Sequence, residues 1–144
     1  MIHQRGNAVW NGDIKGNGTI TSQSGQLDAP YSTGARFEGK KGTNPEELIG
    51  AAHAGCYTMF LTNILGQDGK TVKQIRTESK VELDLSGDVP KVTKITLTTE
   101  GEVEGITQEE FQQYAQKAKE HCPISQLLKA VPEMELASAT LKNS

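Results

Sequence analysis

The chain has 144 residues and a net charge of −3. Its basic residues are scattered, which excludes the electrostatic footprint of a nucleic-acid-binding protein. The apolar runs are shorter than a membrane span and the first ten residues lack the apolar core of a signal peptide, so we expect a cytoplasmic protein that is not bound to a membrane. The length suits one domain over residues 1–144. Its two cysteines, in a reducing compartment, favour redox, catalytic or metal-binding chemistry over a permanent disulfide.

The first part of the chain predicts a β-hairpin followed by an irregular region. Residues alternate in polarity or are β-branched over 2–10 and 18–24, with glycine and asparagine turn residues between the two stretches. We expect a loop over residues 24–34 and then a short strand at Ala35–Glu38. A linker between domains is the alternative for residues 25–42, although this stretch is short and mixed in composition.

The stretch from Thr43 to Leu65 carries a strong helix signal. Thr43 or Asn44 can cap it, Pro45 suits the first helical position, and two glutamates follow. Apolar residues then recur mostly three or four positions apart, which predicts one apolar stripe along the helix. The stripe consists of Leu48, Ile49, Ala52, Cys56, Met59, Phe60 and Ile64.

The rest of the chain alternates between strands and helices. Period-two patterns predict two strands that pair antiparallel, and Thr107 with Glu110 forms a capping box. The expected elements are strands over 72–85 and 92–101, helices over 107–120 and 124–130, and a strand over 133–141. This order predicts an α+β fold with antiparallel sheets around a long central helix. Because these few strands cannot cover that helix, we expect a homodimer that buries it.

Two interpretations fit each cysteine. Cys56 is either a small buried hydrophobic residue, the common fate of a free cysteine, or a reactive thiol that its small neighbours leave accessible. Cys122 precedes Pro123, which favours an extended backbone and makes the cysteine the N-cap of the next helix. A thiol in that position favours the thiolate, unless it simply packs. The two cysteines can form a reversible disulfide if their α-carbons come within about 7 Å.

Two stretches carry a resemblance to a known family. FEGKKGTNPEELIGAAHAGC over 37–56 and KAKEHCPISQLLKA over 117–130 resemble the OsmC branch of the OsmC/Ohr family, the osmotically inducible hydroperoxide peroxidases of bacteria. Trp10, Asn11-Gly12 and Gly18 fit the same pattern, so the resemblance covers essentially the whole chain. It implies an OsmC/Ohr-like intertwined homodimer with its sites at the subunit interface.

The resemblance also implies four site residues. Cys56 would be the peroxidatic cysteine and Cys122 the resolving one, while Arg36 and Glu46 would hold and activate the thiolate. In the Ohr branch the arginine comes from earlier in the chain. On one unbroken helix Glu46 and Cys56 would stand about 15 Å apart along the axis. Either the helix breaks near Gly50 or Glu46 reaches the Cys56 of a second subunit, and the family favours the second. Without the resemblance, Glu46 is explained as a charge at a helix N-terminus and Arg36 as a surface residue.

The implied activity is the reduction of organic hydroperoxides, and less well of hydrogen peroxide, to alcohols in oxidative or osmotic stress defence. Cys56 would become a sulfenic acid and then condense with Cys122 to a disulfide. An external dithiol must reduce this disulfide, and the resemblance implies a lipoyl group or lipoylated protein in preference to thioredoxin. No metal or bound cofactor is required. The apolar residues expected around the thiols, which suit an organic hydroperoxide, are Met59, Phe60, Ile124 and Leu127.

Two other functions are alternatives. His53 stands one helical turn before Cys56, and His121 adjoins Cys122, so four nitrogen and sulfur donors could bind a metal, although their spacing matches no recognised ligand framework. Otherwise we expect His53 to pack or to hydrogen-bond locally, where it would tune Cys56, and His3 to be exposed. A non-enzymatic small-molecule carrier using the same apolar pocket would keep its binding after both cysteines are replaced.

Overall fold

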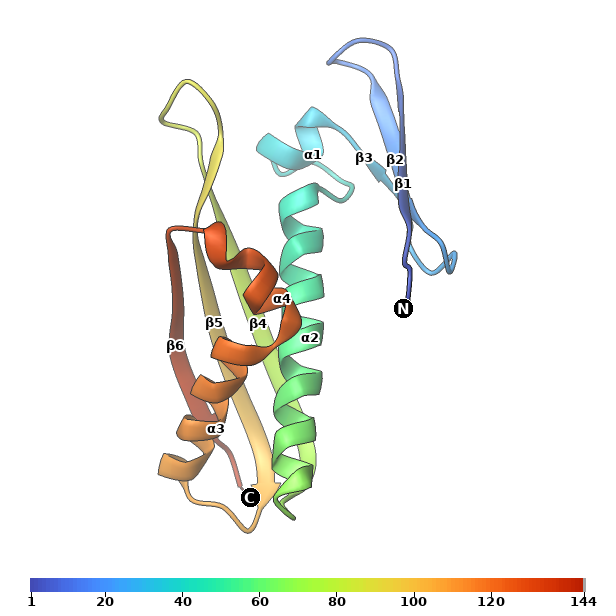
Figure 1. Ribbon diagram of the computed structural model, residues 1–144. Helices are drawn as coiled ribbons and strands as arrows, with labels where there is room; N and C mark the ends of the chain where they lie inside the picture. The colour runs from blue at the N-terminus through green and yellow to red at the C-terminus, as the bar shows by residue number, and fades with distance from the viewer. Residues whose placement is uncertain (144) are drawn as a thin grey trace. The chain divides into compact units, whose positions relative to one another are not determined.

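The computed structural model describes residues 1–143, and Ser144 lies outside the described residues. The chain forms two compact units, Met1–Leu48 and a second that begins at Ile49 (Figure 1). Each unit contains a three-stranded sheet. That residues 1–144 act as one domain stays a prediction.

The first unit contains an antiparallel sheet. In the order of the sheet, its strands are β1 (Gly6–Asn11), β2 (Asn17–Ser22) and β3 (Asp28–Tyr31). β1 pairs with β2 through residues such as Trp10 and Gly18, which confirms the predicted hairpin. Gly18 is required there because a Cβ would come within 2.5 Å of the Tyr31 ring. That ring packs edge-on against Trp10, with 5.3 Å between the centroids.

Two predictions for the segment after the hairpin were wrong. The expected strand at Ala35–Glu38 is instead part of the helix α1 (Thr33–Phe37) and the residue that follows it. The helix forms because Ser32 caps it, accepting a hydrogen bond from the Ala35 backbone N–H at 3.0 Å. The strand β3 lies in a stretch expected to be loop, and its Pro30 is tolerated because β3 is an edge strand.

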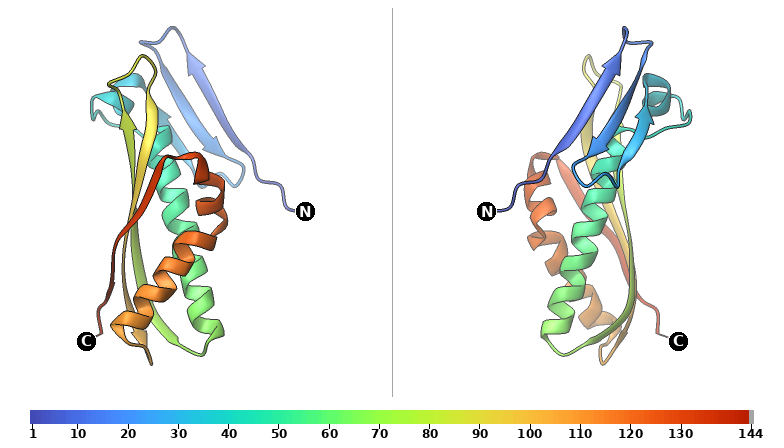
Figure 2. Two further views of the ribbon diagram at one scale, coloured as in Figure 1. Left: turned by 60° about the vertical axis from the view of Figure 1, so that its left-hand side comes forward. Right: turned by 90° about the vertical axis from the view of Figure 1, so that its right-hand side faces the viewer.

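The second unit packs helices against one face of a sheet (Figure 2). Its elements are α2 (Pro45–Gln67, which starts in the first unit), β4 (Thr71–Asp84), β5 (Lys91–Glu104), α3 (Gln108–His121), α4 (Pro123–Leu127), the 3₁₀ turn η1 (Leu128–Ala130) and β6 (Glu133–Leu141). β4 and β5 pair antiparallel as predicted, whereas β6 runs parallel to β5. The parallel pair arises because α3 and α4 carry the chain back along the sheet before β6 begins.

The core of the second unit lies between this sheet and the helices. Alternate residues of β5 are buried, as expected for a strand with one face on a core. The largest fully buried apolar side chains are Tyr57, Leu61, Leu65, Ile95, Leu97, Val103 and Phe111. Burying a side chain of this size stabilises the fold by about 1.5–3 kcal/mol. Gly101 of β5 leaves the room that Phe111 occupies, because a Cβ there would lie 2.9 Å from the ring.

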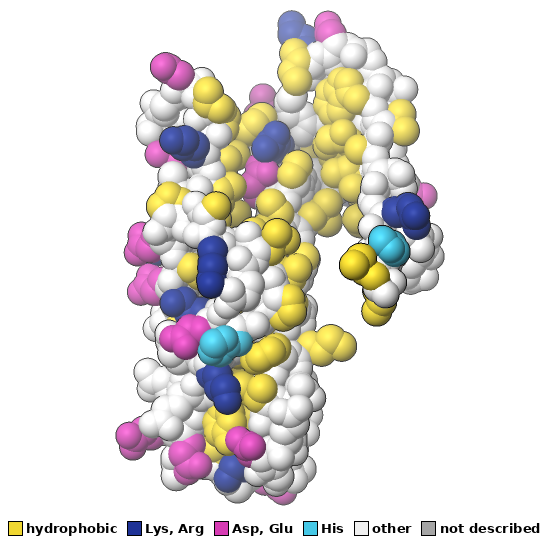
Figure 3. Space-filling model, in the orientation of Figure 1, with side chains coloured by type: hydrophobic (Ala, Val, Ile, Leu, Met, Phe, Trp, Pro, Cys, Tyr) yellow, Lys and Arg dark blue, Asp and Glu magenta, His cyan; other side chains and the backbone are white. Residues whose placement is uncertain are grey.

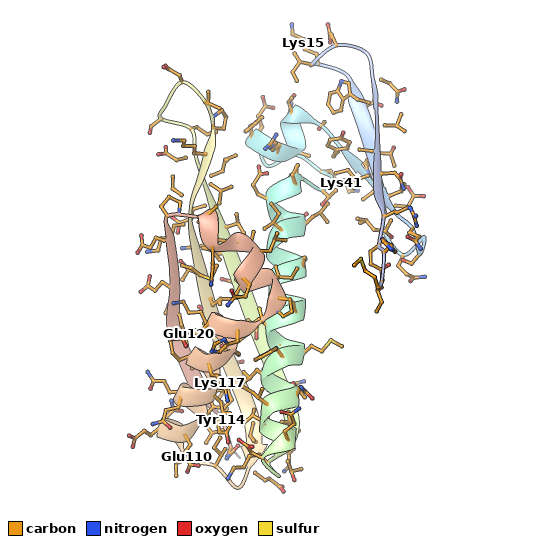
Figure 4. The ribbon with its side chains drawn as sticks, in the orientation of Figure 1. Lys15, Lys41, Glu110, Tyr114, Lys117 and Glu120 are labelled. Atoms are coloured by element: carbon orange, nitrogen blue, oxygen red, sulfur yellow. The ribbon has the colours of Figure 1, made fainter. Side chains whose placement is uncertain are left out.

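α3 is an amphipathic helix whose outer side is polar. The predicted capping box is confirmed: Thr107 and Glu110 exchange side-chain to backbone hydrogen bonds at its start. Glu110, Lys117 and Glu120 follow one another along the helix (Figure 4). Charged side chains gather over α3 in the space-filling view (Figure 3). This face of the unit has the polar composition expected of a solvent-exposed helix face.

α2, in contrast, is apolar on several sides. Its buried residues are Gly50, His53, Tyr57, Leu61, Ile64 and Leu65. The predicted stripe was therefore partly wrong, since Ala52 is exposed and the Met59 side chain is 75% exposed. Hydrophobic side chains line the surface along α2 (Figure 3). α2 is long and apolar enough to span a membrane by length and composition alone. Its buried residues, however, pack in the core of the second unit.

Gly50 marks a close approach of α2 to β4, because a Cβ at this position would lie 2.8 Å from the Ser79 carbonyl oxygen. We expect Gly50→Ala to lower the free energy of unfolding by about 1–3 kcal/mol, although alanine is the better helix former. Gly66→Ala is the matched control, because its Cβ would meet no atom within 4 Å. It should leave the free energy unchanged or raise it by up to about 1 kcal/mol. Urea denaturation measures both, and equal stabilities would contradict the close packing at Gly50.

Candidate active site

The two cysteines, distant in sequence, come together in the second unit. Cys56 lies on α2 and is half-buried, whereas Cys122 lies between α3 and α4 and is fully buried. Both are free thiols, and they lie close enough together for Cys122 to raise the pKa of Cys56. The structure thus places a partly accessible sulfur next to a protected one.

Burial is the main influence on the Cys56 thiol, and it raises its pKa. A backbone hydrogen bond at Ile124 lowers the pKa, while the charge and the hydrogen bond of Cys122 raise it further. Together these influences favour the protonated thiol. A reactive thiolate at Cys56 therefore needs an additional group that stabilises negative charge.

Cys122 is fixed by the two helices that it separates. Its backbone N–H donates to the Ala118 carbonyl at 3.0 Å at the end of α3. Its sulfur accepts a hydrogen bond from the Ser125 backbone N–H at 3.3 Å at the start of α4. Pro123 occupies the first turn of α4 and Cys122 has the extended backbone that a residue before proline favours. The predicted N-cap is confirmed, and it determines where the sulfur lies.

His53 of α2 is fully buried. Its ring connects α2 with β4 and α4. Its Nδ1 lies 2.9 Å from the Ser79 hydroxyl of β4. Its Nε2 lies 2.8 Å from the Ser125 hydroxyl of α4. Burial lowers the pKa of His53 below its ordinary value. The ring is therefore predominantly neutral at pH 7, with both of its nitrogens engaged by serine hydroxyls.

These contacts argue against the metal site that His53, Cys56, His121 and Cys122 suggested. Both His53 nitrogens already have hydroxyl partners, and His121 is exposed, with its Nε2 3.9 Å from Glu120. Among residues 1–143, no three His, Cys, Asp or Glu side chains converge in a way that could hold a metal ion. The four proposed donors do not form one coordination site.

Arg36 and Glu46 form a bidentate ion pair in the first unit. Nε and Nη2 of Arg36 donate to the two carboxylate oxygens of Glu46 at 2.7 and 3.1 Å, the fork-to-fork geometry that makes such pairs strong. The guanidinium also lies over the Phe37 ring, 5.2 Å from its centroid. The structure therefore brings these two predicted residues together, with Arg36 on α1 and not on a strand.

A pocket of about 270 Å³ opens beside this ion pair. Arg36 provides its charge, and most of its other walls are apolar. These walls include Trp10, Ile14, Tyr31, Phe37 and Pro45. The pocket can therefore accept an apolar group next to a cation that is already oriented by a carboxylate.

Glu46 and Cys56 share a helix but do not meet along it. α2 runs without a break from Pro45 to Gln67, so the two residues stand about 15 Å apart along its axis. The alternative in which the helix breaks near Gly50 is wrong. A site that combines Glu46 with Cys56 then requires two subunits.

Ser79 and Ser125 were not among the predicted site residues, although both contact His53. Ser125 follows Cys122 by three positions, the spacing of an N-cap and its third helical residue, and that spacing was an available signal. Ser79 gave none, because it is one of many polar and apolar residues that alternate along β4. Only the packing of α2 against β4 brings it to His53.

The comparisons with known proteins agree with one another. The family model for OsmC-like proteins matches residues 38–137. The chain is 51% identical over 131 residues to peroxiredoxin OsmC of Escherichia coli, an alignment that covers 90% of this chain and 92% of that protein. It is 28% identical over 129 residues to the organic hydroperoxide resistance protein OhrB of Bacillus subtilis, covering 83% and 87%. The chain belongs to the OsmC/Ohr family, in its OsmC branch.

Solved structures share this fold. The crystal structure of Bacillus subtilis OhrB matches with a TM-score of 0.70 at 26% identity, over 96% of this chain and 98% of that one. An OsmC-like protein from Mycoplasma pneumoniae matches with a TM-score of 0.77 over 97% of each chain, and at 16% identity this likeness concerns the fold alone. The predicted α+β fold class is confirmed.

The lowered pKa of His53 makes stability depend on pH. The unfolded chain binds a proton at His53 more readily than the folded chain does. The free energy of unfolding therefore falls as the pH drops below about 6.5, the ordinary pKa of histidine, and stops falling below the lower pKa of the folded chain. We expect this loss to set in as the pH falls through about 6.5, with a slope from this group of at most about 1.4 kcal/mol per pH unit. Urea denaturation at several pH values measures it. His53→Gln should reduce the slope, and identical slopes would show that His53 is not buried in its neutral form.

Proposed function

We propose that this protein is a thiol-dependent peroxidase that reduces organic hydroperoxides, and less well hydrogen peroxide, to alcohols in oxidative and osmotic stress defence. The observation that carries the proposal is the proximity of two free thiols, half-buried Cys56 and fully buried Cys122, in a chain of the OsmC branch. Its relatives include a peroxiredoxin and several organic hydroperoxide resistance proteins. The accessible sulfur suits reaction with peroxide, and the protected one suits a second step that excludes other thiols.

The chemistry follows from these two positions. The Cys56 thiolate attacks the terminal peroxide oxygen, the O–O bond breaks, the alkoxide leaves and takes a proton to become the alcohol, and Cys56 becomes a sulfenic acid. Cys122 then attacks the sulfenic sulfur, releasing water and forming a disulfide. An external dithiol restores the two thiols. Because Cys56 is the more accessible sulfur, the reductant attacks it first and Cys122 is the leaving group.

A homodimer would supply the positive charge that Cys56 needs to form a thiolate. Its pKa is raised within its own unit, and the unbroken α2 holds Glu46 about 15 Å away along the helix. In the proposed dimer, the Arg36–Glu46 pair of one subunit lies at Cys56 of the other and stabilises the thiolate. The dimer would also cover the exposed face of α2, which includes Met59.

The substrate class follows from the surroundings of Arg36. The pocket beside it is mostly apolar. In the second unit, Met59 and Leu127 are 75% and 73% exposed, and we propose that the dimer brings this apolar surface to the substrate as well. Such a lining favours a peroxide with a carbon chain or ring over hydrogen peroxide. Equal rates with both peroxides would count against this preference.

We propose that a dithiol reduces the Cys56–Cys122 disulfide and that the protein acts in the cytoplasm. Two free thiols suit a reducing cytoplasm, and the family resemblance favours a lipoyl group or a lipoylated protein as the dithiol. The four site residues supply the proposed steps without a bound metal or cofactor.

Cysteine variants test the proposed activity. With cumene hydroperoxide and a dithiol, wild type should turn over, whereas Cys56→Ser should lose all turnover because it lacks the attacking sulfur. Cys122→Ser should react once and stop as a sulfenic acid, which mass spectrometry detects with a dimedone label. A wild-type protein that consumes neither cumene hydroperoxide nor hydrogen peroxide would refute the peroxidase proposal.

Mixed dimers test whether two subunits share each site. Arg36→Ala should lower the rate about a hundredfold, because the charge that stabilises the thiolate is lost, and Cys56→Ser should be inactive. A dimer of one chain of each kind keeps a complete site, with Cys56 from one subunit and Arg36 from the other. Coexpression with two affinity tags should therefore restore activity. Arg36→Ala paired with the double variant Arg36→Ala/Cys56→Ser is the control, and restoration no greater than in this control would contradict a shared site.

A further inference from the structure

A line of four polar side chains crosses the second unit and ends at Cys122. It runs from Ser79 on β4 through His53 on α2 and Ser125 on α4 to the Cys122 sulfur. The successive distances are 2.9 Å from Ser79 Oγ to His53 Nδ1, 2.8 Å from His53 Nε2 to Ser125 Oγ, and 3.1 Å from Ser125 Oγ to Cys122 Sγ. His53, Ser125 and Cys122 are buried, whereas Ser79 is only half-buried. The line therefore joins a protected thiol to a more accessible position.

The hydrogen bonds along this line run in one direction, from the Cys122 thiol toward Ser79. The Cys122 thiol donates to the Ser125 oxygen, and a serine hydroxyl has one proton to donate. The neighbouring acceptor for that proton is Nε2 of His53. If Nε2 instead carried a proton, it would donate to Ser125 and leave the serine proton buried without this acceptor, which is costly. The satisfied arrangement has Nε2 bare and Nδ1 protonated, donating to Ser79.

We propose that Ser125, His53 and Ser79 form a proton wire that removes the proton of Cys122 as it attacks the Cys56 sulfenic acid. This inference rests on the proposed peroxidase function, and it concerns the second chemical step alone. Ser125 touches the reacting thiol, and His53 acts on it through Ser125.

The atoms and charges of the step balance. The Cys122 sulfur forms the S–S bond as the S–O bond of the sulfenic acid breaks, and hydroxide leaves with the electron pair and takes a proton from solvent. The Cys122 proton moves to Ser125 Oγ while the Ser125 proton moves to His53 Nε2. Nδ1 of His53 gives its proton to Ser79, whose own proton passes to solvent. One proton enters and one leaves, and His53 changes tautomer without holding a lasting positive charge, which suits a ring whose burial disfavours the cation.

A second hydroxyl network on α2 provides a matched control. The Thr58 hydroxyl donates to the Ala54 carbonyl at 2.7 Å and lies 2.8 Å from the Thr77 hydroxyl of β4, which lies 3.0 Å from the Thr99 hydroxyl. This network also joins α2 to β4, as the His53–Ser79 contact does. None of the hydrogen bonds of Thr58 involves Cys122 or Ser125. Thr58→Val therefore disturbs a comparable contact outside the wire.

Rapid-quench mass spectrometry after one equivalent of cumene hydroperoxide resolves the sulfenic acid and the disulfide in time. His53→Gln and Ser125→Ala should form the sulfenic acid within threefold of the wild-type rate and the disulfide at least about tenfold more slowly, the usual range for loss of a proton-transfer group. Thr58→Val should keep both rates. The inference is overturned if both wire variants form the disulfide within threefold of wild type, or if they slow both steps equally. A wild type that forms neither the sulfenic acid nor the disulfide would instead refute the peroxidase function.

The wild-type protein provides a test that does not depend on the variants folding. Nitrogen-15 NMR of the three histidines, assigned by through-bond correlation, reports which ring nitrogen of His53 carries the proton. In the reduced protein Nδ1 should be protonated and Nε2 bare. A proton on Nε2 in the reduced protein would overturn the wire, because Nε2 could not then accept from Ser125.

Discussion

Pro123 constrains the junction on which the thiol chemistry depends. It ends the run of α3 and begins α4, and it holds the preceding residue in an extended conformation. Cys122 therefore closes one helix with its backbone N–H and opens the next with its sulfur. A cysteine in the middle of a helix could not have both roles. The same short turn places Ser125 against the sulfur on one side and against His53 on the other.

α2 carries Cys56 beside this junction, and its composition supports the proposed dimer. The face that packs in the core contains His53 and Tyr57, and small residues such as Gly50 let the helix approach the sheet. Another side carries exposed apolar residues such as Met59. An exposed apolar face of this kind is typical of a surface that a partner covers. A dimer that covers this surface would be the means of bringing a cation to Cys56, so stability and chemistry would depend on one interface.

Local signals predicted much of the fold, whereas contacts between distant segments had to come from the structure. The helix start at Pro45, the alternation of β4 and the capping box of Thr107 depend on residues close in sequence. All three predictions are confirmed. The cap at Ser32 was overlooked because it lies among turn residues. The predicted apolar stripe of α2 was partly wrong because a helix that is apolar on several sides shows little periodicity. The residues that hold His53 were not identified because they come from β4 and α4, and the roles of Arg36 and Glu46 rested on the family resemblance.

The central claim is that Cys56 and Cys122 act as one redox pair. The most direct measurement is the mass and the thiol count of the reduced protein after one equivalent of cumene hydroperoxide per subunit, without any reductant present. The account predicts the loss of both thiols, a mass decrease of two hydrogens, and a disulfide joining the Cys56 and Cys122 peptides of the same chain. Two unchanged thiols, or a disulfide only between different chains, would contradict it.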